Sequence, residues 1–174
     1  MRVLVAVASR HGAAREIAEA VGGTLAEAGI AVDVRDADGG PAPEDYDAVV
    51  LGSAVYMGRW LGPARDYVDL HADALAARPV WLFSSGPIGD PPKPAPDEAV
   101  DVAEIVERTG ATEHRLFPGR LERKLLGFTE RAVVTAFRAP DGDFRDWDEI
   151  AAWARSVAAD LPLRTTATSA SAIV

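Results

Sequence analysis

The sequence predicts a three-layer α/β fold built on a doubly wound parallel sheet of five strands. Short valine-rich runs alternate with amphipathic segments, as expected of strands joined by helical crossovers. A chain of 174 residues with 48% hydrophobic and 26% charged residues fits one globular domain. We expect the domain to span residues 1–161 and the small, polar stretch 162–174 to be a disordered tail.

Five segments have the composition of strands. Residues 2–8, 46–53 and 79–85 are continuous apolar runs, which favours strands buried on both faces. Residues 30–35 alternate like an edge strand, and residues 113–119 give a weaker fifth strand. Because parallel strands need crossover connections, we expect helices between them.

The helical pattern is clearest in residues 13–29. Ile17, Val21 and Leu25 recur every four positions there, and Gly29 ends the pattern. The other predicted helices span residues 63–77, 97–110, 121–137 and 146–161. The connections 36–45, 54–62 and 86–96 are predicted to be loops.

The composition excludes several classes of function. A net charge of −9 argues against binding to nucleic acid or to an anionic membrane. No cysteine is present, and His11, His71 and His114 are far apart, so we expect no metal site. The chain has neither a signal-peptide pattern nor an apolar run of 18 residues, so we expect a cytoplasmic protein without stable membrane insertion.

Three loops follow the carboxyl ends of predicted strands, where doubly wound sheets bind ligands. The first loop precedes a helix whose free N–H groups and dipole favour an anion. Its residues are Ser9, Arg10, His11, Gly12, Ala13 and Ala14. The alternative is that Ser9 only caps the helix and that Arg10 is solvated.

The second and third loops suit a flat ring. The second places Tyr56, Met57, Gly58 and Trp60 after a strand, where aromatic side chains can stack on a ligand or fold back over the next helix. The third combines serines with glycine and proline, which leaves backbone N–H and C=O groups free to approach a heterocycle. The alternative is that this loop is an ordinary connection. Its residues are Ser84, Ser85, Gly86, Pro87, Ile88 and Gly89.

Two common ligand signatures and one common domain of this topology are excluded. No G-x-G-x-x-G and no P-loop follows the first strand, which argues against dinucleotide and triphosphate sites. A receiver domain would need acidic residues after the first strand, a phospho-accepting aspartate after the third and a lysine after the fifth. The chain has Ala8-Ser9, Gly52-Ser53 and Pro118-Gly119 there.

With these loops placed, the chain resembles the flavodoxin superfamily and, within it, the menaquinone-dependent protoporphyrinogen dehydrogenase family. Residues 9–18 resemble that family's S-T-R-D-G-Q-T-R-E-I-A region, and residues 46–60 its third strand and flavin-flanking loop. Residues 117–121 and the helix after them resemble its extra insertion, and residues 147–154 its last helix.

The resemblance implies flavin mononucleotide (FMN), with its phosphate on the first loop and its ring between the second and third. It also implies an FMN-dependent oxidoreductase of the protoporphyrinogen or quinone type. No catalytic residue follows from the resemblance. The phosphate loop departs from the superfamily's T-x-T-G-x-T, because His11 and Ala14 replace two hydroxyl residues. Arg10 or protonated His11 could offset this loss by pairing with the phosphate.

A basic segment leaves the choice of partner open. Residues 115–138 contain six basic residues and two acidic ones. The helix predicted within this segment either covers the sheet or forms a lip near residues 120–131 that meets a porphyrin, a quinone or a protein. The alternatives to an oxidoreductase are a flavodoxin-type electron carrier between proteins and a flavin-free binding module.

Overall fold

The central sheet has the predicted parallel core. A computed structural model describes residues 1–86, 100–136 and 140–171. Five parallel strands run in the order β2-β1-β3-β5-β6. They are β1 (Arg2–Ala8), β2 (Ala31–Asp36), β3 (Ala48–Tyr56), β5 (Val80–Ser85) and β6 (Glu113–Phe117). Because β1 lies between β2 and β3, the winding direction reverses at β1, as the doubly wound fold requires.

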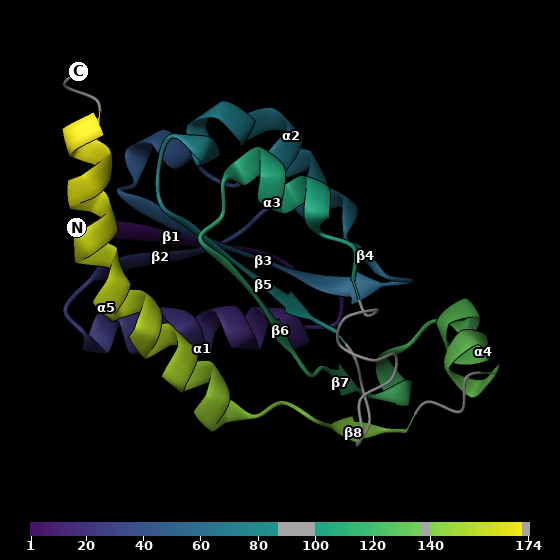
Figure 1. Cartoon of the computed structure of the whole chain (residues 1–174). Helices are drawn as coiled ribbons and strands as arrows, with labels where there is room; N and C mark the ends of the chain where they lie inside the picture. The colour runs from purple at the N-terminus through teal and green to yellow at the C-terminus, as the bar shows by residue number, and fades with distance from the viewer. Residues whose placement is uncertain (87–99, 137–139, 172–174) are drawn as a thin grey trace.

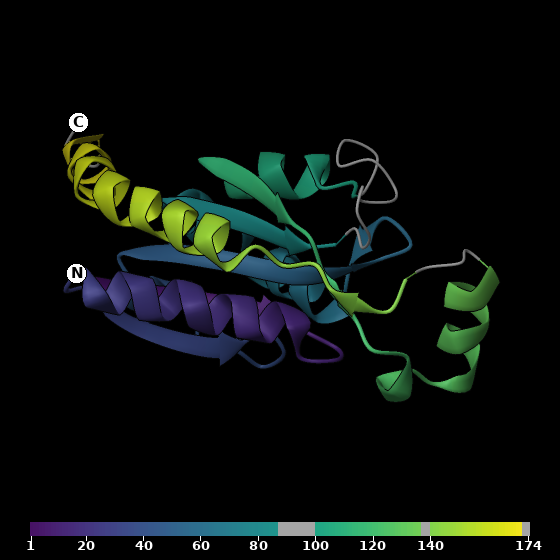
Figure 2. The same cartoon turned by 90° about the horizontal axis from the view of Figure 1, so that it is seen from below.

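Helices cover both faces of the sheet (Figures 1 and 2). On one face lie α1 (Ala13–Glu27) and α5 (Trp147–Ser171). On the other lie α2 (Gly62–Ala76) and α3 (Ala103–Thr109). Alternate residues of β1 divide between the two cores, so that Val5 faces α1 and α5 whereas Leu4 faces α2.

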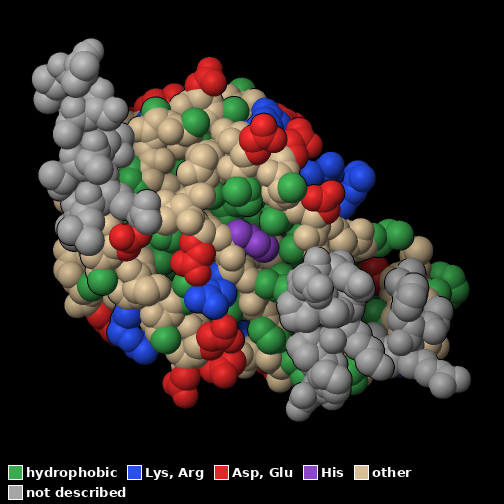
Figure 3. All heavy atoms as spheres, in the orientation of Figure 1, with side chains coloured by type: hydrophobic (Ala, Val, Ile, Leu, Met, Phe, Trp, Pro, Cys, Tyr) green, Lys and Arg blue, Asp and Glu red, His purple; other side chains and the backbone are tan. Residues whose placement is uncertain are grey.

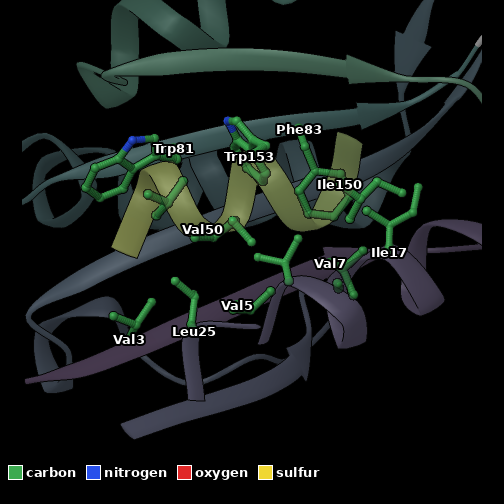
Figure 4. Close-up of a cluster of buried hydrophobic side chains, with 14 of the residues drawn as sticks. Val3, Val5, Val7, Ile17, Leu25, Val50, Trp81, Phe83, Ile150 and Trp153 are labelled. Carbon is green, nitrogen blue, oxygen red and sulfur yellow. The ribbon is translucent and has the colours of Figure 1, made fainter. Parts of the chain in front are cut away.

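The core beneath α1 and α5 is built from the predicted stripes. Ile17, Val21 and Leu25 of α1 are fully buried, as their spacing predicts. Figure 4 shows Phe83 of β5 beside Trp153 of α5, above valines of β1. The aromatic rings pack edge to face, with 6.2 Å between the centroids of Phe83 and Trp153.

One predicted loop contains a short strand. β4 (Arg59–Trp60) pairs antiparallel with the end of β3. Met57 and Gly58 form a two-residue turn between them, with φ of 51° and 74°. Positive φ at both positions is the backbone that tight hairpins prefer. The hairpin lies at the carboxyl edge of the sheet (Figure 1).

An insertion between residues 120 and 143, described over 120–136 and 140–143, lies at this same edge (Figure 2). Its elements are β7 (Arg120–Leu121), a 3₁₀ turn (Arg123–Leu125), α4 (Phe128–Ala136) and β8 (Gly142–Asp143), and β7 pairs with β8. The predicted helix over 121–137 is therefore wrong for residues 121–127. Helix α4 begins only after Gly127, whose N–H donates to the Glu130 carboxylate at 2.8 Å.

Two other helix boundaries differ from the prediction. Helix α3 begins at Ala103, because residues 100–102 are not helical, and residues 97–99 lie outside the described residues. Helix α5 continues to Ser171, although the sequence predicts a disordered tail from residue 162. Helical hydrogen bonds are local, each joining an N–H to the carbonyl four residues earlier, so a polar composition alone does not end a helix. None of the helices within the described ranges is long and apolar enough to cross a bilayer.

Candidate functional site

The first loop (residues 9–14) connects β1 to α1 at the carboxyl edge. Gly12 precedes the helix with φ of 87°, and no side chain caps the helix. The first N–H groups of α1 therefore lack a side-chain acceptor. The Ser9 hydroxyl oxygen is buried and, among the described residues, has no hydrogen-bond partner. A buried hydroxyl without a partner is costly in a folded protein, so a ligand atom is expected near it.

A cavity of about 330 Å³ opens beside Ser9. It lies between the ends of β1 and β2 and the start of α2. Its lining residues are Val7, Ala8, Ser9, Asp36, Asp38, Leu61 and Pro63. A volume of this size is at the lower end of the range for small-molecule pockets.

Both basic side chains of the first loop contact one carboxylate of the insertion. Glu130 Oε1 lies 3.0 Å from Arg10 Nε and 3.1 Å from His11 Nε2. The pKa of Glu130 is below its usual range, because the Gly127 N–H, then His11 and Arg10, stabilise the charged form. Arg10 and His11 are thus paired with a protein anion at the place where the sequence predicts a phosphate.

Two arginines hold the other side of this loop. Arg145 is buried and donates from Nη1 to the Ala13 carbonyl at 3.1 Å and to Glu16 at 2.9 Å. Arg120 also pairs with Glu16 at 2.9 Å and lies beside Gly12. The insertion is therefore connected to the first turn of α1 by charged hydrogen bonds.

Tyr56 is the aromatic side chain that the structure places next to the first loop. Its ring centroid lies 5.6 Å from the Arg10 guanidinium and 6.4 Å from the His11 ring. Burial raises the pKa of Tyr56, because the phenolate would lose solvation there. Met57, at the hairpin tip, is 97% exposed. The carbonyl oxygen of Gly58 accepts a hydrogen bond from the Asp101 N–H.

Trp60 follows the second of the two alternatives for the aromatic residues of the second loop: it folds back beside α2 and is not available for stacking on a ligand. Its side chain is 2% exposed and belongs to the core beneath α2. The cause is the unpredicted pairing of β4 with β3, which places Trp60 opposite Val55 and turns its ring inward. Its Nε1 donates to the Ser84 hydroxyl at 2.7 Å.

The third predicted loop is only partly a loop. Ser84 and Ser85 are buried residues of β5, and the Gly86 N–H donates to the Phe117 carbonyl, so it is not free for a ligand. The remaining predicted residues, Pro87, Ile88 and Gly89, lie outside the described residues. Ser84 and Ser85 therefore form the end of β5 at the carboxyl edge of the sheet.

Ser84 also lies 2.8 Å from His114 Nε2, and this contact predicts a pH effect on stability. Burial lowers the pKa of His114. His114 therefore binds a proton more readily in the unfolded chain than in the folded protein. The free energy of unfolding should fall as the pH drops below about 6.5. We expect the urea midpoint to fall less between pH 7.5 and pH 5.5 in His114→Gln than in the wild type. Equal pH dependence in the two proteins would contradict this assignment.

The sequence does not reveal which residues beyond position 119 frame the first loop. Arg120 and Glu130 of the insertion, and Arg145 just after it, are 104 to 132 positions away from their partners in the first loop and the first turn of α1. For Arg120 and Glu130 the sequence signal is the basic composition of residues 115–138. Most of these basic side chains are engaged by carboxylates or carbonyls of the protein, as with Lys124 on Glu122 and Arg131 on the Arg123 carbonyl. Phe128, by contrast, is 91% exposed.

The surface charge agrees with the composition. On the face shown in Figure 3, acidic side chains are spread among neutral and apolar ones, with a few basic side chains between them. Among the described residues, no group of three or more histidine, aspartate or glutamate side chains could hold a metal ion.

Comparison with known proteins identifies related sequences and folds. A family model described as "Flavodoxin domain" matches residues 4–148. Protoporphyrinogen IX dehydrogenase [quinone] of Escherichia coli strain K12 is 24% identical over 172 residues, which covers 91% of this chain and 95% of that protein.

Solved structures resemble the fold. A Streptococcus pneumonia TIGR4 flavodoxin has a TM-score of 0.60 at 17% identity and covers 92% of this chain and 99% of its own. A flavodiiron protein from Giardia intestinalis has a TM-score of 0.59 at 15% identity and covers 96% of this chain but 36% of its own. At these identities the structural matches establish the fold.

Proposed function

The chain belongs to the flavodoxin domain family, and from this premise we propose that it is an FMN-dependent redox protein with the cofactor at the carboxyl edge of its sheet. The family implies a flavin cofactor and electron transfer. When bound, FMN would supply the redox chemistry, and the protein would supply binding, orientation and electrostatics. The observation that carries the proposal is the buried Ser9 hydroxyl without a partner, beside a helix that no side chain caps.

The first loop fits a phosphate group. The Ser9 hydroxyl and the N–H groups that begin α1 are donors at one helix end, and the helix dipole favours a negative ligand there. Gly12 gives the turn its positive φ. The Ala14 side chain is fully buried in the core and offers no hydroxyl donor, so the Ser9 hydroxyl and the backbone N–H groups would hold the phosphate.

The ring is proposed to lie against Tyr56, which adjoins the first loop, with the strand end at Ser85 and Gly86 on the other side. Tyr56 offers a flat, half-buried ring on which the isoalloxazine could stack. Met57 and Gly58 form the hairpin tip that would exclude water from that side. Trp60 supports the hairpin from within the core.

We further propose an oxidoreductase whose electron partner is a quinone or a porphyrinogen. The name of the Escherichia coli relative supports this choice, as does the insertion beside the site. Residues 120–131 would border such a substrate, with the exposed ring of Phe128 offering apolar contact. In this function the chain's own contribution is to bind the substrate next to the cofactor and orient it.

A flavin-free binding module is the second candidate. Two observations favour it: Ala14 lacks the hydroxyl of the superfamily's phosphate loop, and Glu130 occupies both basic side chains of the first loop. An absorbance spectrum of the purified protein, with and without added FMN, separates the two candidates. A protein that stays colourless and does not bind added FMN would overturn the proposal. An electron carrier would instead bind FMN but fail to reduce quinones at a useful rate.

Removal of the Ser9 hydroxyl should weaken FMN binding. We expect Ser9→Ala to raise the Kd for FMN by about tenfold to a hundredfold, because a hydrogen bond to a charged group contributes roughly 1.5–3 kcal/mol. Riboflavin, which lacks the phosphate, serves as the control ligand, and its Kd should change little. Flavin fluorescence quenching measures both. An equal loss for the two flavins would place Ser9 near the ring or the side chain of the flavin instead of the phosphate.

A further inference from the structure

We propose that Glu130 sets how strongly the site prefers phosphorylated over unphosphorylated flavin, by competing with the phosphate for Arg10 and His11. This inference rests on the proposed function and adds a specificity-determining residue to it. Glu130 comes from the insertion, 116 positions after the end of the first loop, and its carboxylate reaches both basic side chains of that loop.

The carboxylate is the fixed partner in this contact. Its Oε2 accepts from the Gly127 N–H at 2.8 Å, which anchors it at the start of α4. Its side chain is 17% exposed, whereas Arg10 is 56% exposed and can turn toward solvent. The same Oε1 atom contacts Arg10 Nε and His11 Nε2, so one oxygen is shared by both donors. A phosphate that approached these side chains would meet a carboxylate already in place.

The other charges at the loop are balanced. Glu16, in the first turn of α1, is paired with both Arg120 and Arg145. Asp143 accepts two hydrogen bonds from Arg145, at 2.8 and 2.6 Å. Glu130 is therefore the carboxylate that pairs with the loop's own basic side chains.

The sign of the effect follows from Coulomb's law. A phosphate monoester and a carboxylate repel each other, and an anion beside the loop must either displace Glu130 or bind next to it. Replacing Glu130 with glutamine keeps an oxygen acceptor for Arg10 and His11 but removes the negative charge. Riboflavin is uncharged, so its affinity should not depend on this charge. An alternative role, in which Glu130 orients Arg10 and His11 toward the phosphate, predicts the opposite sign.

The test compares the wild type, Glu130→Gln and the control Asp141→Asn. Asp141 also carries one negative charge in the insertion, and its carboxylate accepts from the Arg123 N–H. Fluorescence quenching would give the Kd of FMN and of riboflavin for each protein at one low ionic strength, and FMN titrations at rising salt would follow. We expect Glu130→Gln to bind FMN about tenfold more tightly, with the gain reduced by salt and with riboflavin and the control variant unchanged.

Each outcome decides the proposal. FMN binding that weakens or stays the same in Glu130→Gln, while the wild type binds FMN, overturns the role of Glu130 and leaves the proposed function standing. Tighter binding of both flavins also overturns it, because the phosphate would then not be the group that senses Glu130. Failure of the wild type to bind FMN overturns the proposed function and this inference with it, whether or not Glu130→Gln binds FMN.

Discussion

Gly52→Ala is expected to destabilise the fold by about 3 kcal/mol, the upper end of the usual cost of overfilling a core. A Cβ at position 52 would lie 2.0 Å from the tip of the Phe83 ring, which crosses Gly52 from the neighbouring strand. Phe83 cannot move away easily, because it is fully buried and packs against Phe117 and Trp153. Urea unfolding followed by tryptophan fluorescence would measure the loss.

Gly23→Ala is the matched control. Gly23 lies on the exposed side of α1, and a Cβ there would meet no atom within 4 Å. Alanine should therefore stabilise the helix by roughly 0.5–1 kcal/mol, because glycine loses more backbone freedom on folding. If Gly52→Ala were as stable as the wild type, the aromatic core would have to be less tightly packed around Phe83 than the contacts indicate.

The fold could be predicted because its strands carry a strong local signal. Residues 3–8 and 80–83 are apolar on both faces, and the structure buries them in β1 and β5 between two helical layers. The stripe of Ile17, Val21 and Leu25 likewise fixed the buried face of α1. Such periodicities depend on neighbouring residues alone, so a single sequence contains them.

Tertiary pairing decided the features that the sequence did not reveal. Trp60 lies in a segment that the sequence predicts as a loop, and its burial in the core depends on the pairing of β4 with β3. The helix predicted from residue 121 begins at Phe128, because β7 pairs with β8 across the insertion. No local pattern in residues 54–62 or 120–127 encodes these partners.

For the candidate site, too, the sequence predicts the position but not the long-range contacts. Its position at the carboxyl edge follows from the order of strands and helices, and the first loop lies where the sequence places it. The charged residues that frame it come from the insertion and from Arg145 just after it, far along the chain. The sequence therefore offers Arg10 and His11 as possible phosphate partners, whereas the structure pairs both with Glu130. Composition alone cannot show whether a basic side chain is free or already engaged.

Arg145→Met should weaken both the fold and the proposed cofactor site. Arg145 is 8% exposed, and its guanidinium bridges the Ala13 carbonyl, Glu16 and Asp143. Methionine fills a similar volume but leaves all three acceptors without this donor. Because the carboxylates of Glu16 and Asp143 are 41% and 40% exposed, water can replace part of the pairing. We therefore expect a loss of about 2–3 kcal/mol, below the range for a fully buried ion pair.

The same substitution tests whether Arg145 positions the first loop for FMN or only stabilises the fold. Arg145 holds the backbone at Ala13, where α1 begins, so its loss should raise the Kd for FMN as well as lower the free energy of unfolding. Arg145→Lys keeps the charge but not the planar fork, and should recover only part of both. Arg155→Met, which removes an exposed arginine from α5, should change neither. If Arg145→Met unfolds more easily but binds FMN as tightly as the wild type, Arg145 stabilises the insertion without shaping the first loop.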